Sequence, residues 1–172
     1  MVYHSSLNEV DAQQVCGCSM LPLKTTTRGP APLAPEEGDD ILDEVLNFFK
    51  ANVLFKHFEV KGGADRLLIY LTLYTTQCLQ RLEKCPSPVE GLKALTAMAH
   101  EQFRIPGDAG FALGSFFPGP ATMQEGELCR TYLKQAREEL GRRLVSKVYG
   151  EDGLPSKFWI VFAKKKFMNK VL

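Results

Sequence analysis

Apolar residues recur at three- and four-residue spacing through residues 41–49, the first strongly periodic segment of the chain. They are Ile41, Leu42, Val45, Leu46, Phe48 and Phe49. This spacing places them on one broad face of an α-helix. Asp39 or Asp40 is suited to cap its first turn. We therefore predict a helix that begins after these aspartates and runs to about Phe55.

A second helix is expected from Ala64 or Asp65 to Lys84. Its segment Leu67 to Tyr74 is apolar nearly all round. A helix without a polar face, in a chain whose apolar runs are too short to cross a membrane, belongs at the centre of a fold, wrapped by other helices. The β-branched and aromatic content of the segment also fits a strand, but its length and its polar continuation favour a helix.

Two capping boxes mark the starts of two further helices. The run Ser-Pro-Val-Glu at 87–90 places proline at the first helical position, and Thr-Met-Gln-Glu at 122–125 precedes a periodic apolar pattern that stops near Gly150. Residues 105–121 between them form a loop rich in glycine, proline and phenylalanine. Its large apolar side chains are too hydrophobic to be left in solvent.

The two ends of the chain carry weaker patterns. Residues 1–38 contain four prolines and no periodic face, so we predict an irregular N-terminal arm whose scattered apolar side chains pack on the domain. Ser156 to about Met168 is predicted to be a short helix with a seam of four aromatic residues, although 158–163 also fits a strand. The predicted fold class is all-α: about five helices in a single domain over 39–172, with one central buried helix surrounded by the others.

Composition indicates an ordinary globular protein. The 172 residues are enough for one domain, and contents of 45% hydrophobic and 24% charged residues exclude a wholly disordered chain. A formal net charge of +1 argues against a dedicated nucleic-acid binder. We find no signal-peptide pattern and no apolar run of membrane-spanning length. Five cysteines, an odd number, are best explained as reduced thiols in the cytosol.

No catalytic, cofactor-binding or metal-binding motif is found, and we expect none of these sites. The glycines have the wrong spacing for a phosphate-binding loop, and Ser115 lacks the second glycine of a nucleophile elbow. Cys16 and Cys18 have no partners at zinc-ligand spacing. The histidines are far apart in the chain: His4, His57 and His100. An enzyme would need one of them beside a carboxylate or a thiol, and finding all three isolated would remove this hypothesis in its most accessible form.

The clearest charge pattern is a C-terminal group of lysines without any acidic residue. Its members are Lys157, Lys164, Lys165, Lys166 and Lys170. The interleaved aromatic residues are Phe158, Trp159, Phe162 and Phe167. This combination supports an alternative function, a basic helical adaptor that binds nucleic acid or acidic membrane. The simpler interpretation is that the aromatic rings dock into the core while the lysines solvate the end of the helix.

Several blocks of the sequence resemble one known family. The longest is FKANVLFKHFEVKGGADRLLIYLTLY at residues 49–74. The others are YHSS at 3–6, MLPL at 20–23, GPAP at 29–32, CLQRLEKC at 78–85, FRIPGDAGFAL at 103–113, YLKQAREELGRRL at 132–144 and PSKFWIVFAKKKFMNK at 155–170. In this order, and with coverage of nearly the whole chain, they resemble the family of subunit 3, the 21 kDa subunit, of the actin-related protein 2/3 complex.

The resemblance implies a non-catalytic structural subunit of an assembly that nucleates branched actin filaments in the cytoplasm, as part of the cytoskeleton. It implies an all-helical fold, no cofactor, no nucleic acid, and the other subunits as partners, chiefly actin-related protein 3. The resemblance does not identify which individual residues of this chain contact its partners. Large apolar groups on loops and unpaired charges often mark interfaces. On that ground the candidate partner-binding residues are Phe111, Phe116, Phe117, Lys157, Lys164, Lys165, Lys166 and Lys170.

Overall fold

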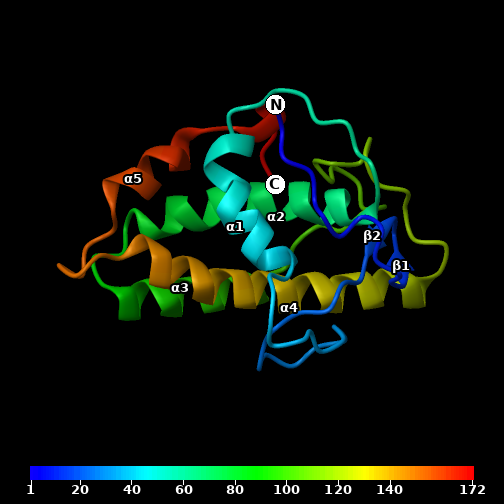
Figure 1. Ribbon diagram of the computed structural model, residues 1–172, viewed down its shortest axis with the longest axis horizontal. Coiled ribbons are helices and arrows are strands. Elements are labelled where there is room, and N and C mark those ends of the chain that lie inside the picture. The colour runs from blue at the N-terminus through cyan, green and yellow to red at the C-terminus, as the bar shows by residue number, and fades with distance from the viewer.

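The computed structural model describes residues 1–172 and is mostly helical, with five α-helices, two 3₁₀-helices and one small sheet. The α-helices are α1 (Ile41–Asn52), α2 (Gly63–Leu82), α3 (Pro88–His100), α4 (Met123–Val148) and α5 (Lys157–Ile160). The other elements are η1 (Val161–Lys164), η2 (Phe167–Asn169), β1 (Gln14–Val15) and β2 (Cys18–Ser19). Helix α3 packs along α4, and α1 crosses α2 at a steep angle (Figure 1). None of these helices has both the length and the apolar content that crossing a bilayer requires.

Three helices begin where the sequence predicts them. The carboxylate of Asp40 accepts from the N–H of Asp43, and the Asp43 carboxylate accepts from the N–H of Asp40, which completes a capping box for α1. Ser87 and Thr122 cap α3 and α4 by accepting from the backbone N–H three residues on. Those two predicted boxes are only half formed, because neither glutamate accepts from the N–H of the capping residue: Glu90 accepts from the Ser87 hydroxyl and Glu125 from the N–H of Ala121. Helix α1 also ends before the predicted Phe55.

Helix α2 is buried along most of its length. Sixteen of its 20 residues are buried, and no side chain from Leu67 to Tyr74 is more than 2% exposed. It contacts α1, α3, α4, η1 and β2, so segments from both ends of the chain cover it. The buried hydroxyl of Tyr70 accepts a hydrogen bond from the Arg137 guanidinium at 3.3 Å, which gives this polar group the partner that burial requires.

Buried carboxylates fasten the N-terminal arm to α1 and α2. Glu44 on α1 accepts from the hydroxyls of Ser5 and Ser6 at 2.5 and 2.6 Å, and from the N–H of Ser6 at 2.9 Å. Asp65, at the start of α2, accepts from the N–H of Ser5 at 2.8 Å and lies 2.7 Å from Nδ1 of His4. These bonds tie the first residues of the arm to two helices that are remote from it in sequence.

The arm contains a hairpin that the sequence analysis missed. Strands β1 and β2 are antiparallel and pair Val15 with Cys18. Cys16 and Gly17 make the turn between them, with φ of 54° and 80°. Positive φ at both central residues is the conformation of a type I′ turn, whose twist matches that of the flanking strands. The all-α prediction was therefore wrong in this detail, and the fold is mostly helical.

The predicted helix over residues 156–168 was wrong as a single element. The segment divides into α5, η1 and η2, with extended backbone at Lys165 and Lys166 between η1 and η2. In a continuous helix Phe167 would point about 140° away from Phe162, because each residue turns by about 100°. The break allows Phe167 to reach Phe58, with ring centroids 6.0 Å apart, while Phe162 packs on α1.

Candidate protein-interaction surfaces

The loop between α3 and α4 turns two of its three candidate phenylalanines inward. The ring of Phe111 stacks on Tyr70 with centroids 6.4 Å apart. Phe117 packs against Phe111 in a T-shaped arrangement with centroids 5.5 Å apart. Both are only 8% exposed, so they offer a partner little area. Phe116 is half-buried, and the ammonium group of Lys170 lies 5.9 Å from its ring centroid. Of the three rings, Phe116 is therefore the best placed to be touched by a partner.

Two charged side chains hold this loop against the arm. Arg66 on α2 donates to the carbonyl oxygens of Phe116 and Gly17 at 2.6 and 2.9 Å. Glu125 on α4 accepts from one N–H of the loop and from that of Cys16, at 2.6 and 2.8 Å. These two backbone hydrogen bonds lower the pKa of Glu125, because they stabilise its ionised form. Polar contacts thus link the loop, the hairpin and the start of α4.

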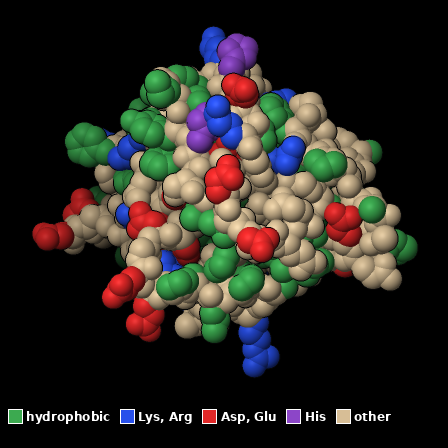
Figure 2. All heavy atoms as spheres, turned by 45° about the vertical axis from the view of Figure 1, so that its right-hand side comes forward, with side chains coloured by type: hydrophobic (Ala, Val, Ile, Leu, Met, Phe, Trp, Pro, Cys, Tyr) green, Lys and Arg blue, Asp and Glu red, His purple; other side chains and the backbone are tan.

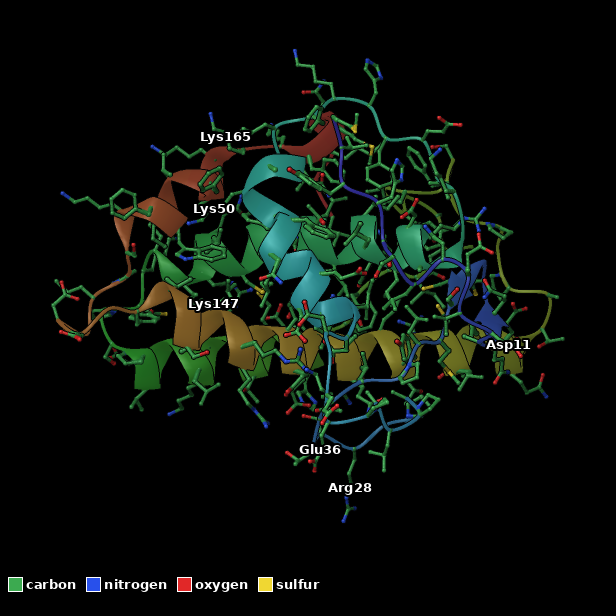
Figure 3. The ribbon with its side chains drawn as sticks, viewed as in Figure 1. Asp11, Arg28, Glu36, Lys50, Lys147 and Lys165 are labelled. Carbon is green, nitrogen blue, oxygen red and sulfur yellow. The ribbon has the colours of Figure 1, made fainter.

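The five candidate lysines carry charge that no nearby carboxylate balances. Lys157, Lys164, Lys165 and Lys166 are exposed, and Lys170 is half-buried. None of them lies within 4.0 Å of a carboxylate oxygen. Lys165 projects from the outer edge of the C-terminal segment (Figure 3). On the face drawn in Figure 2, by contrast, acidic, basic and apolar side chains are interspersed. The C-terminal lysines are therefore free to attract an acidic partner.

The same segment exposes apolar side chains that the sequence analysis did not identify. Phe158, expected in the buried seam, is 81% exposed, and Val161 is 58% exposed. A helical wheel places Val161 outside, since it lies about 200° from the inward-facing Trp159, but nothing in the pattern singles out Phe158. We call the group formed by Lys157, Phe158, Val161, Lys164 and Lys165 the C-terminal surface.

Most of the interleaved aromatic rings are unavailable for stacking on nucleic-acid bases. Trp159 stacks on Phe49 with centroids 6.1 Å apart and lies under the ammonium group of Lys50 at 4.3 Å. Two of the other rings pack inward on α1 and on Phe58, as described above. Phe158 alone remains largely exposed. A single exposed ring is a poor platform for the base stacking that nucleic-acid binders of this kind use.

Two of the three histidines lie beside carboxylates, so the histidines are not all isolated. His4 lies 2.7 Å from Asp65, and Nε2 of His100 lies 3.3 Å from Glu138. Asp65 also accepts from two backbone N–H groups, at 2.8 and 3.0 Å, so its bonds hold the arm and the start of α2 in place. No three His, Cys, Asp or Glu side chains come close enough together to hold a metal ion.

The whole chain matches proteins of a known family. The family model described as P21-Arc: ARP2/3 complex ARPC3 (21 kDa) subunit matches residues 1–172. The chain belongs to this family. It is 47% identical to the actin-related protein 2/3 complex subunit 3 of Arabidopsis thaliana, over 100% of this chain and 99% of that protein. It is 47% identical to the protein of the same name from Dictyostelium discoideum, over 100% of both chains, and 42% identical to that of Saccharomyces cerevisiae, over 99% and 98%.

Membership of the P21-Arc family confirms the resemblance of the sequence blocks and decides between the functional hypotheses. The family is one of structural subunits and not of enzymes. The histidine–carboxylate pairs are therefore interpreted as contacts that support the fold. The surfaces that remain to be explained are those that other proteins can touch.

Proposed function

We propose that the protein is a non-catalytic structural subunit of the actin-related protein 2/3 complex and contributes to the nucleation of branched actin filaments. The observation that carries this proposal is the match of the P21-Arc model to residues 1–172. Relatives at 42–47% identity over nearly their full lengths are named as subunit 3 of that complex. In this role the protein works in the cytoplasm, in association with the actin cytoskeleton.

Its partners in this role are the other subunits of the complex. Among them, actin-related protein 3 is the main contact in our proposal, as the family resemblance implies. The chain reaches actin filaments through the assembled complex. No cofactor or nucleic acid enters the proposal.

The organisation that we propose is one helical domain over residues 39–172, with the arm over 1–38 packed on it and α2 as the central helix. In support, a single cluster of 41 buried apolar residues has members in the arm, in each of α1–α4 and in the C-terminal segment. A subunit with one continuous core loses little conformational entropy on binding, so its contact energy can favour one arrangement of its partners.

The contact residues that we propose are the C-terminal surface together with Phe116, Lys166 and Lys170. An exposed aromatic side chain surrounded by unpaired lysines fits a partner surface that offers an apolar pocket with an acidic rim. Phe111 and Phe117 would act indirectly, by holding the loop that presents Phe116. Arg66, which bonds that loop to the arm, would keep it in register with α2.

Affinity purification tests the proposed membership. A tagged copy of the full chain should recover both actin-related proteins and the remaining subunits at equal stoichiometry, measured by quantitative mass spectrometry. Complex assembled without the chain should form fewer branches per filament length in an imaging assay, and adding the chain should restore them. Recovery of the tagged chain without actin-related proteins would contradict the proposal.

A matched pair of triple variants tests the contact surface separately. Phe158→Ser with Lys164→Glu and Lys165→Glu alters the C-terminal surface, whereas Val89→Ser with Lys93→Glu and Lys147→Glu alters exposed positions elsewhere. Both sets change exposed side chains, so each should alter the free energy of unfolding by only about 0.5 kcal/mol per substitution. The first variant should recover about tenfold less actin-related protein 3 than the second. Equal recovery would disprove the contact surface and leave membership of the complex intact.

A further inference from the structure

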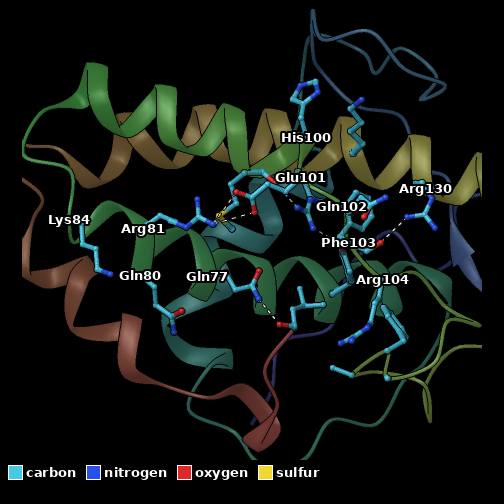
Figure 4. Close-up of a pocket in the computed structure, with 18 residues that line it drawn as sticks. Gln77, Gln80, Arg81, Lys84, His100, Glu101, Gln102, Phe103, Arg104 and Arg130 are labelled. Carbon is cyan, nitrogen blue, oxygen red and sulfur yellow. Dashed lines mark hydrogen bonds and ion pairs between the residues drawn. The ribbon is translucent and has the colours of Figure 1, made fainter.

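A cleft of about 930 Å³ lies between α2, α4 and the chain that follows α3, and it shares no residue with the C-terminal surface. Figure 4 shows its lining side chains. Glu101 is the one acidic residue among them. The basic ones are Arg81, Lys84, Arg104, Arg130, Lys134 and Arg137. This excess of positive charge in a concave site concentrates the local field and favours an anionic ligand.

Several of these cations have no carboxylate to neutralise them. Lys84, Arg104 and Lys134 lie farther than 4.0 Å from every carboxylate oxygen. Arg81 is held by Glu101, with both carboxylate oxygens within 3.2 Å of one guanidinium nitrogen. Arg137 is only 4% exposed, and its buried Nε has no hydrogen-bond partner. The cleft therefore offers free cations at its rim and an incompletely bonded guanidinium in its wall.

The shape of the cleft favours an extended ligand over a compact one. Along α2 and the two residues that follow it, the lining runs from Tyr70 to Lys84, which corresponds to about 21 Å at the helical rise. Lys84 lies at one end and Arg104 at the other, with the amides of Gln77 and Gln80 between them (Figure 4). An extended peptide covers that length with about six residues. Charges spread along such a ligand can meet cations at both ends.

The side chains of the cleft also favour peptide over nucleic acid. Its aromatic rings are covered: Tyr70 and Phe111 are 1% and 8% exposed, and the Arg137 guanidinium lies 4.0 Å from the ring centroid of Phe103. Single-stranded nucleic acid needs exposed rings on which its bases stack, whereas carboxylates need only the cations. We propose that this cleft binds an extended acidic segment, about six residues long, of a partner protein.

Fluorescence polarisation with labelled hexaglutamate and the full chain tests the proposal. Binding should saturate at low ionic strength and weaken as salt is added, because the contacts are between exposed charges. The triple variant K84A/R104A/K134A should bind about tenfold more weakly, as expected for the loss of three such contacts. The control K56A/K93A/K147A removes the same charge from exposed positions outside the cleft and should bind as the unaltered chain does.

A second variant should change the affinity for hexaglutamate in the opposite direction. Glu101→Gln removes the one acidic side chain of the cleft and frees Arg81, so hexaglutamate should bind about threefold more tightly. Circular dichroism of each variant would establish that it is folded. Non-saturable binding, equal affinities for the two triple variants, or weaker binding to E101Q would each overturn the proposal. So would a single-stranded oligonucleotide that binds more tightly than hexaglutamate and displaces it.

Discussion

At the scale of single residues, Asp40 bonds to more parts of the structure than its place at a helix start indicates. Besides capping α1, its carboxylate accepts from the N–H of Lys24 at 3.0 Å and from two guanidinium nitrogens of Arg143 at 2.6 and 2.8 Å. Burial alone would raise the pKa of Asp40, but the hydrogen bonds from Arg143, Lys24 and Asp43 outweigh it and lower that pKa. One side chain thus joins the arm, α1 and α4.

Replacing the Asp40 carboxylate by an amide removes the charge but keeps the cap, since asparagine is also a good N-cap. The variant therefore measures the contribution of the charge alone. We expect Asp40→Asn to lower the free energy of unfolding at neutral pH by about 1.5–3 kcal/mol, because Arg143 loses its nearest carboxylate but keeps those of Asp43 and Glu139 at 3.1 and 3.3 Å. A lowered pKa stabilises the fold above the unfolded-state pKa, and that stabilisation is lost as pH falls through the folded-state pKa. The difference between the two proteins should therefore shrink below about pH 4 in urea titrations.

Asp39→Asn is the control for this prediction, since Asp39 is the exposed neighbour and forms no ion pair in the structure. It should change the free energy of unfolding by less than about 0.5 kcal/mol at any pH. A loss for Asp40→Asn that persists unchanged in acid would mean that the amide disturbs packing and that the ion pair contributes little.

The sequence revealed the local role of such residues but not their distant partners. The capping role of Asp40 was predictable because a cap acts on the next turn of the chain. Its bond to Arg143 joins positions 103 residues apart, which no local pattern encodes. The same holds for Glu44, which looks like a solvated first-turn acid yet is buried against Ser5 and Ser6. For the candidate site, the exposed lysines were predictable from charge, whereas the outward position of Phe158 was not.

At the scale of elements, the hairpin of the arm meets the loop between α3 and α4 at Gly17. This glycine has a φ of +80°, and a Cβ there would overlap the ring of Pro118. Gly38, in the same arm, has a similar φ of +85° but has nothing within 4 Å of a Cβ. A side chain would therefore be strained by the backbone at both positions, but only at Gly17 would it also meet a packed neighbour.

Alanine substitutions at the two positions separate these effects. Gly38→Ala should lower the free energy of unfolding by about 1 kcal/mol, the conformational cost of a side chain in this region. Gly17→Ala should cost about 2–4 kcal/mol, because Pro118 must also move. Urea denaturation of both variants measures the difference. Equal losses would show that the loop yields freely and that the contact with Pro118 does not hold the hairpin.

The helices were predictable to the extent that local chemistry determines their starts. Asp40, Ser87 and Thr122 were identifiable as caps because each precedes a periodic apolar pattern. The hairpin could not be predicted, since strands of two residues show no alternation and its turn is Cys-Gly in place of the usual Asn-Gly. The break near the C-terminus lies at Lys165 and Lys166, whose backbone is extended, and no proline or glycine marks this position in the sequence.

At the scale of the whole molecule, the thiols lie where the arm and the helices share one core. Four of the five cysteines are buried: Cys16, Cys18, Cys78 and Cys129. Burial raises the pKa of the Cys18 and Cys78 thiols to about 12, and it also raises the pKa of Cys16 and Cys129. The thiolate is the reactive form of cysteine. These four thiols are therefore protected by both burial and protonation while the core is closed, whereas Cys85 is partly exposed.

Thiol labelling through a urea titration tests whether the arm and the helices unfold as one domain. In the native chain at about pH 8 only Cys85 should react rapidly with Ellman's reagent, and Cys85→Ser should abolish that phase. If the arm and the helices form one cooperative unit, the arm thiols Cys16 and Cys18 should become labelled at the same urea concentration as Cys78 and Cys129, as read by peptide mass spectrometry. Labelling of the arm thiols at a lower urea concentration would show that the arm detaches first, and would contradict a single core that extends from the arm to the helices.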